Sequence, residues 1–231
     1  MSCIFCNIDT SKIENTIIEE SKNFYVMTSL GSLVDGYLII VSKKHLNSMS
    51  ELSAEEINEY QSLIDKYRKK LKKIYNKYPI VFEHGCPILN SNMNASSIVH
   101  AHSHIVNHNF IDENSIIKKY KFKRINSLLD LTKNENYIMY LNDKNKYYIS
   151  NNFPSVSQLM RKLIADDLGY NEKYDWRKER FIDNIDLTIK KFKNNSIICS
   201  KINDISFEIF NIVKKDYDSF DLCLIKWNYK M

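Results

Sequence analysis

Glycine and proline are scarce in this sequence. The chain of 231 residues holds only 4 glycines and 3 prolines, roughly a quarter of their average share. A glycine-rich phosphate loop of either common type needs several glycines at fixed spacing, so the sequence excludes both types. No apolar run reaches the roughly 18 residues that a membrane span requires. The first seven residues have no charged start and no apolar stretch, so we expect no signal peptide, no membrane partner and a cytoplasmic location.

The overall composition is that of a folded globular protein. Hydrophobic residues make up 44% and charged residues 26%, and the net charge is a mild +5. Many of the basic residues lie between Lys66 and Lys73, in a strongly helical stretch. This run is either a solvated helix face or a nucleic-acid patch. Its aromatic residues recur at helical spacing, which favours the solvated face, and we expect no nucleic-acid partner.

Histidine is absent from the second half of the chain. All six histidines precede residue 109, and three of them alternate as His100, His102 and His104. The surrounding residues follow a period of two, which predicts a strand with three imidazoles on one face, about 6.6 Å apart. An edge strand with solvent-facing histidines is the alternative. Five cysteines are an odd number, so Cys3 and Cys6 indicate metal or redox chemistry rather than a disulfide framework.

The order of predicted elements indicates an α+β fold. We expect strands at 23–27, 36–42, 79–83 and 100–106, separated by loops and one long helix. Ser53 and Glu56 form a capping box that predicts the start of this helix, which extends to about Tyr75 with one apolar stripe. Strands in pairs with a single long helix favour an antiparallel sheet.

Three motifs in this order resemble the histidine-triad (HIT) family of nucleotide hydrolases and transferases. The alternating histidines match the family's His-φ-His-φ-His-φ-φ pattern, where φ is hydrophobic, except that Ser103 is polar. Cys3 and Cys6 resemble the Cys-x-x-Cys opening of many bacterial members. The segment 36–45 resembles the family's second strand, which ends in a histidine, here His45. The resemblance covers about residues 3–110, so we expect a HIT domain at 1–110 and an extension at 111–231.

The resemblance implies a structural zinc ion. In metal-binding members the ligands are the two N-terminal cysteines, the histidine that closes the second strand and the first histidine of the triad. These correspond here to Cys3, Cys6, His45 and His100. Two thiolates and two imidazoles suit a closed tetrahedral site. The alternative is that the two cysteines are merely a small buried pair.

The resemblance also implies the roles of the catalytic residues. His102 corresponds to the nucleophile that attacks the α-phosphorus, His104 to a donor to phosphate oxygens, and Ser97 to a hydroxyl that contacts the phosphate or the leaving group. The positions that correspond to substrate contacts are Ser29, Glu83, Gly85, Ser96 and Ser97. Glu83 stands where the family often has asparagine, and Ser29 where it often has an acidic or amide residue. These departures leave the nucleoside specificity open. His84 is either a structural neighbour or a substrate contact, and His108 is expected in a loop.

The implied activity is cleavage of a nucleotide phosphoanhydride, phosphoramidate or phosphodiester through a covalent nucleotidyl-histidine. Histidine as the third triad residue, rather than glutamine, favours hydrolysis. The alternatives are a nucleotidyltransferase or phosphorylase on the same scaffold, and a catalytically silent, zinc-stabilised binding protein. The expected partners are a nucleotide or nucleotide-conjugate substrate and a second copy of the chain, because the family usually pairs subunits.

The sequence of the extension carries weaker signals for its structure and function. Apolar segments at 137–141 and 146–149 flank a four-residue loop and predict a hairpin. Helices are expected at 154–168 and 178–193, and the stretch from Ser196 is expected to be folded. The extension is expected to be mostly helical. The stretch 154–177 resembles an extension of some bacterial HIT proteins, and a decayed second HIT repeat is the alternative. Either Arg161, Lys162 or Arg177 reaches a substrate phosphate, or the extension has a plain packing role.

Overall fold

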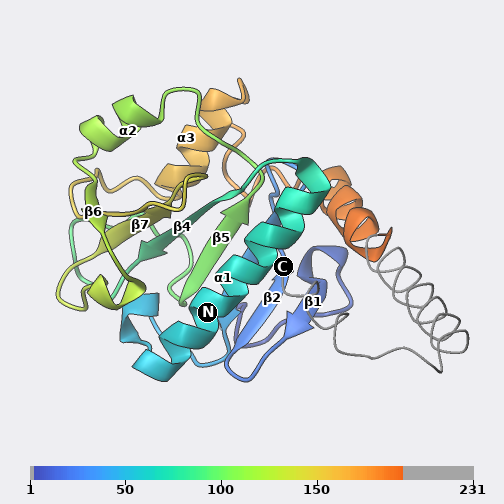
Figure 1. Cartoon of the computed structure of the whole chain (residues 1–231), viewed down its shortest axis with the longest axis horizontal. Helices are drawn as coiled ribbons and strands as arrows, with labels where there is room; N and C mark the ends of the chain where they lie inside the picture. The colour runs from blue at the N-terminus through green and yellow to red at the C-terminus, as the bar shows by residue number, and fades with distance from the viewer. Residues whose placement is uncertain (1–2, 195–231) are drawn as a thin grey trace, which may run out of the picture. The chain divides into compact units, whose positions relative to one another are not determined.

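A computed structural model describes residues 3–194 (Figure 1). Its strands form one eight-stranded antiparallel sheet in the order β1-β2-β3-β5-β4-β7-β8-β6. The strands are β1 Ile17–Glu20, β2 Phe24–Thr28, β3 Tyr37–Ser42, β4 Ile80–Gly85, β5 His102–Val106, β6 Lys123–Ile125, β7 Tyr137–Leu141 and β8 Tyr147–Ser150. The histidine strand β5 is thus central, between β3 and β4, and the alternative of an edge strand is wrong.

Three labelled α-helices accompany the sheet within the described residues, in addition to a helical segment that begins at residue 182. The three are α1 Ala54–Tyr75, α2 Glu113–Lys119 and α3 Leu159–Asp167, and short 3-10 turns occupy Ile13–Asn15, Met49–Glu51 and Leu128–Asp130. The Ser53 hydroxyl accepts from the Glu56 amide in the capping box that opens α1, as predicted. The predicted α+β fold with an antiparallel sheet and one long helix is confirmed. Hydrophobic periodicity did not predict β1, β6 and α2, which are short.

The two faces of the sheet have different roles. Residues paired across neighbouring strands share a face, and His104 is paired with Ile39 of β3 and Phe82 of β4. Leu159, Met160 and Ile164 of α3 pack in the same apolar cluster as these neighbours of the triad. The helix α1 lies across the opposite face (Figure 1), where Tyr60 packs on Phe24 with ring centroids 5.9 Å apart.

The sheet continues past residue 110. The predicted hairpin is confirmed as β7 and β8, and β7 pairs with β4 along five residues. The first compact unit accordingly extends to Lys190. The helix predicted at 154–168 is shorter, as α3, and the one expected from Lys178 begins at residue 182. The stretch from Ser196 lies outside the described residues.

The basic run of α1 is not wholly solvated. Arg68 is buried and donates to the carbonyl oxygens of Pro79 (2.9 Å) and Asn142 (2.6 Å), so it ties α1 to β4 and the hairpin. Lys66 pairs with Glu19 at 2.6 Å. The helical spacing alone did not reveal that one cation of this run points inward. Within residues 3–194, no helix is both long enough and apolar enough to cross a bilayer.

Candidate active site and metal centre

A cavity of about 300 Å³ lies over the histidine face of the sheet. Three parts of the chain line it: the N-terminal segment 3–15, the sheet with its loops, and the extension. The imidazoles in its wall are those of His84, His102 and His104. The strand alternation predicted from the sequence therefore brings two triad histidines to one cavity, together with a third from β4.

His102 has one ring nitrogen engaged and one free. Its Nδ1 lies 2.6 Å from the carbonyl oxygen of His100. A carbonyl only accepts, so Nδ1 carries the proton and Nε2 keeps its lone pair. Among the described residues, no hydrogen bond engages this Nε2 atom. Burial lowers the pKa of His102 to about 4, which leaves the ring neutral.

His104 is held by aromatic neighbours. Its ring stacks on Phe82 with centroids 4.5 Å apart, and its Nδ1 lies 2.9 Å from the hydroxyl oxygen of Tyr37. Burial, and then the nearby His102, His84 and Arg161, hold the pKa of His104 well below its usual range. His104 therefore enters the site as a neutral ring.

The four predicted metal ligands form one cluster. Donor atoms of Cys3, Cys6, His45 and His100 all lie within 4.8 Å of one another. Nδ1 of His100 is 3.2 Å from Nδ1 of His45 and 3.3 Å from Sγ of Cys3, and Cys6 Sγ is 3.2 Å from His45 Nδ1. A tetrahedral zinc ion separates such donor atoms by roughly 3.3–3.8 Å. His100 Nε2 donates to the Ser42 carbonyl (2.7 Å), which leaves Nδ1 free to ligate. The donor set fits zinc.

The candidate metal ligands and the His102 ring are adjacent through one side chain. Phe5, between the two cysteines, has its ring centroid 5.0 Å from that of His102 and 5.5 Å from that of His100. Residues of the same segment line the cavity. Whatever fixes Cys3 and Cys6 therefore also fixes one wall of the cavity beside His102.

The structure separates the predicted substrate contacts into two groups. Ser29, Ser96 and Ser97 line the cavity. Glu83 and Gly85 do not, which corrects the expectation that they contact substrate. Because side chains alternate along a strand, the pairing of Phe82 with His104 turns His84 toward the cavity and Glu83 toward the other face. The Glu83 carboxylate accepts there from the Met49 amide (2.7 Å) and the Tyr137 hydroxyl (2.8 Å).

Glu83 predicts a specific pH dependence of stability. Burial raises its pKa from 4.5 to about 7, so the folded state holds this proton more tightly than the unfolded state. The free energy of unfolding should fall as pH rises from about 4.5 to 7, by on the order of 3 kcal/mol from this group. Denaturant titrations at several pH values measure the slope of the free energy of unfolding against pH. Glu83→Gln, which cannot ionise, should flatten it, and an unchanged slope in this variant would contradict the assignment.

The two remaining histidines differ in their surroundings. His84 lines the cavity, but its Nε2 accepts from the Met160 amide at 3.1 Å, so this lone pair is engaged. Burial lowers the pKa of His84 to about 3. His108 lies in a loop after β5, as expected, and its Nε2 is 2.9 Å from a carboxylate oxygen of Asp167. His108 does not line the cavity.

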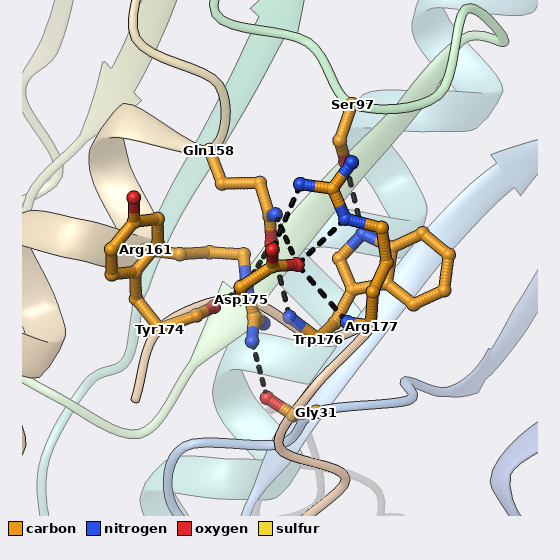
Figure 2. A network of polar contacts seen from close by, with 8 residues as sticks. All are labelled: Gly31, Ser97, Gln158, Arg161, Tyr174, Asp175, Trp176 and Arg177. Atoms are coloured by element: carbon orange, nitrogen blue, oxygen red, sulfur yellow. Dashed lines mark hydrogen bonds and ion pairs between the residues drawn. The ribbon is translucent and has the colours of Figure 1, made fainter. Parts of the chain in front are cut away.

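The extension supplies cavity residues that the sequence did not identify. Gln158 and Trp176 line the cavity together with Arg161. Trp176 Nε1 donates to Ser97 Oγ (3.0 Å), and Asp175 accepts from Gln158 (2.9 Å) and Arg177 (2.8 Å), as Figure 2 shows. The sequence made Arg161, Lys162 and Arg177 candidates for a phosphate contact. Of these three, only Arg161 lines the cavity, because Lys162 pairs with Asp166 and Arg177 with Asp175.

Comparison with known proteins finds a family match over about the first half of the chain. Residues 1–121 match the family described as "Protein similar to CwfJ C-terminal". An uncharacterized HIT-like protein from Methanocaldococcus jannaschii is 25% identical over 105 residues, which are 45% of this chain and 77% of the relative. A histidine triad protein from Clostridium difficile is 24% identical, with a TM-score of 0.37, over 46% of this chain and 90% of its own.

A Hit-like protein from Bartonella henselae is 17% identical to this chain, with a TM-score of 0.33. The match covers 39% of this chain and 63% of the Bartonella protein, so it spans less than two thirds of that relative.

Proposed function

Since the chain belongs to the family of proteins similar to the CwfJ C-terminus, and is a histidine-triad protein as its sequence predicts, we propose that it hydrolyses nucleotide conjugates. The substrate is a nucleotidyl phosphoanhydride, phosphoramidate or phosphodiester. His102 is the nucleophile, His104 and Ser97 stabilise the phosphate oxygens, and the reaction passes through a covalent nucleotidyl-histidine.

One observation carries this proposal. Of the three imidazoles in the cavity wall, His102 is the one whose Nδ1 faces a carbonyl, which fixes its proton there, and no hydrogen bond among the described residues engages its Nε2. The lone pair of His84 is used by Met160 and that of His104 Nδ1 faces Tyr37. A neutral imidazole fixed in this tautomer is a competent nucleophile at neutral pH.

The reaction then proceeds in two displacements. His102 Nε2 forms a bond to the α-phosphorus while the bond to the leaving group breaks, and the leaving atom takes the electron pair and then a proton from solvent water. Water then attacks the phosphorus, the phosphorus–nitrogen bond breaks, its electron pair returns to Nε2, and one water proton is released. The Ser97 hydroxyl accepts from Trp176, so its own proton can be donated to a phosphate oxygen.

The remaining assignments concern binding and metal. Ser29 and Ser96, in the cavity wall, are proposed to contact the nucleotide. We assign a structural zinc ion to Cys3, Cys6, His45 and His100, because their donor atoms have the chemistry and spacing of a tetrahedral site. The ion holds the N-terminal segment against the cavity. A homodimer and a cytoplasmic location stay predictions.

Product analysis tests the activity. Purified protein is incubated with nucleotides that carry each of the three leaving-group linkages, and released nucleoside monophosphate is measured by chromatography. Hydrolysis should release monophosphate from at least one linkage, and His108→Asn, a histidine outside the cavity, should retain it. Absence of turnover on every linkage, with nucleotide still bound, would instead favour the silent binding protein.

A second reaction class shares the same first step. A nucleotidyltransferase or phosphorylase would pass the nucleotidyl group to a sugar phosphate or to inorganic phosphate. Adding each acceptor to the same assay separates the cases. Hydrolysis predicts that the nucleotidyl group is transferred to water and that the rate of monophosphate release is unchanged by either acceptor. Transfer predicts a new nucleotide product whose amount increases with acceptor concentration.

A further inference from the structure

Arg161 is a buried cation whose described partners are all neutral. Its side chain is 2% exposed, although it comes from α3 in the extension and lines the cavity. Its acceptors are Gln158 Oε1 (3.1 Å), the Tyr174 carbonyl (3.1 Å), the Gly31 carbonyl (2.7 Å) and the Tyr37 hydroxyl (3.1 Å). Among residues 3–194, none of these partners is a carboxylate. A buried guanidinium without a counter-charge is costly, so its presence beside the triad needs a reason.

Its contact with Tyr37 has a chemical consequence. A guanidinium can only donate hydrogen bonds, so the Tyr37 oxygen accepts from Arg161 Nη1. The other neighbour of this oxygen is Nδ1 of His104, at 2.9 Å. The Tyr37 hydroxyl proton is therefore directed to His104 Nδ1, because the described residues offer it no other acceptor. A neutral His104 that accepts at Nδ1 must carry its proton on Nε2.

We propose that Arg161, acting through Tyr37, is a positioning residue that fixes His104 in the Nε2–H form, so that the third triad histidine donates to the substrate phosphate. This inference rests on the proposed function and adds a residue of the extension to the site. It also explains how two neighbouring histidines play opposite roles. His102 donates at Nδ1 and offers a bare Nε2, whereas His104 accepts at Nδ1 and offers Nε2–H.

The extension is held closely enough to fix this geometry. Gly31 has a φ of +75°, and a Cβ atom on it would lie 2.7 Å from Arg161 Nη2 and 2.6 Å from the Trp176 Cβ atom. Only glycine permits this approach. The Gly31 amide also donates to the Arg180 carbonyl at 3.0 Å. Figure 2 shows Arg161 between Gln158 and the Gly31 carbonyl. The extension is thus anchored to the loop that precedes β3, the strand that carries Tyr37.

Nitrogen NMR of the resting full-length chain tests this inference without substrate. The protein is labelled with ¹⁵N-histidine, and long-range nitrogen–proton spectra report which ring nitrogen carries the proton. Wild-type His104 should show a protonated Nε2 and an unprotonated Nδ1. Tyr37→Phe, which removes only the hydroxyl, should yield a mixture of both forms, and so should Arg161→Met. Lys162→Met is the matched control, since Lys162 is the partly exposed neighbour of Arg161 outside the cavity and should leave the spectrum unchanged.

Steady-state kinetics with a substrate that the protein cleaves provide the second readout. We expect kcat to fall by about 10- to 100-fold in Tyr37→Phe and Arg161→Met with KM changed little, because the bond to phosphate strengthens in the transition state. Arg161→Lys, which still donates to Tyr37, should recover part of the loss. A wild-type His104 protonated at Nδ1, or nitrogen shifts unchanged in Tyr37→Phe, would overturn the inference. Since the NMR result needs no turnover, the failure of this inference is separable from the failure of the proposed hydrolysis.

Discussion

Replacement of His102 by alanine is expected to lower kcat on the order of 1,000-fold or more, because it removes the atom that forms the covalent bond. The Nδ1 atom of His104 is occupied by the Tyr37 hydroxyl, and the Nε2 lone pair of His84 by the Met160 amide. Neither neighbouring imidazole can therefore replace the lost Nε2. Steady-state rates at saturating substrate measure the loss.

One matched variant and one binding measurement separate this effect from damage to the fold. His108→Asn removes a buried imidazole outside the cavity, where His108 faces Asp167, and should keep kcat within a few-fold of the wild type. His102→Ala should keep its nucleotide affinity, since the cavity stays lined by the same serines. A His102→Ala protein that turns over at near wild-type rate would remove His102 from the mechanism.

Loss of zinc is expected to destabilise the protein strongly. Structural zinc ions contribute roughly 10–16 kcal/mol of binding free energy in small domains. In this larger domain, we expect Cys3→Ser and Cys6→Ser to abolish metal binding and to lower the melting temperature by about 10 °C, or roughly 3–5 kcal/mol. Because Phe5 packs on His102, substrate affinity should fall as well. Metal analysis and thermal melts of the same samples measure both effects.

Cys86 provides the control for these variants. It is a buried free cysteine whose thiol is 3.6 Å from Asn136 Nδ2, and it is not part of the metal cluster. Cys86→Ser should retain one zinc ion per chain. Full zinc content in Cys3→Ser, or equal zinc loss in Cys86→Ser, would contradict the ligand assignment.

Short sequence spacings were enough to predict much of the site. The alternation of the triad predicted the common strand face of His102 and His104, since side-chain direction follows directly from a period of two. The strand begins at His102, so His100 lies before it and joins the cysteine and histidine cluster instead. The metal ligands followed from the family resemblance, which placed Cys3 and Cys6 with two distant histidines. The structure brings all four together. The capping box at Ser53 likewise located the start of α1.

The remaining features depend on strand register and tertiary packing. Glu83 was aligned with a substrate contact, but the register of β4 against β5 turns His84 to the cavity instead. That register is set by the packing of Phe82 and its partners, which local sequence does not encode. Arg161 gains its role from Tyr37, 124 positions away in the chain. Charge alone could not separate it from Lys162 or Arg177.

Mapping the covalent intermediate tests the central assignment most directly. The protein is mixed with an α-labelled nucleotide conjugate, quenched in alkali, digested and analysed by mass spectrometry. We predict a nucleotidyl group attached to Nε2 of His102, stable in alkali and lost in acid, and absent from His102→Ala. An adduct on a different residue, or one that persists in His102→Ala, would contradict the mechanism, as would turnover with no adduct at any quench time.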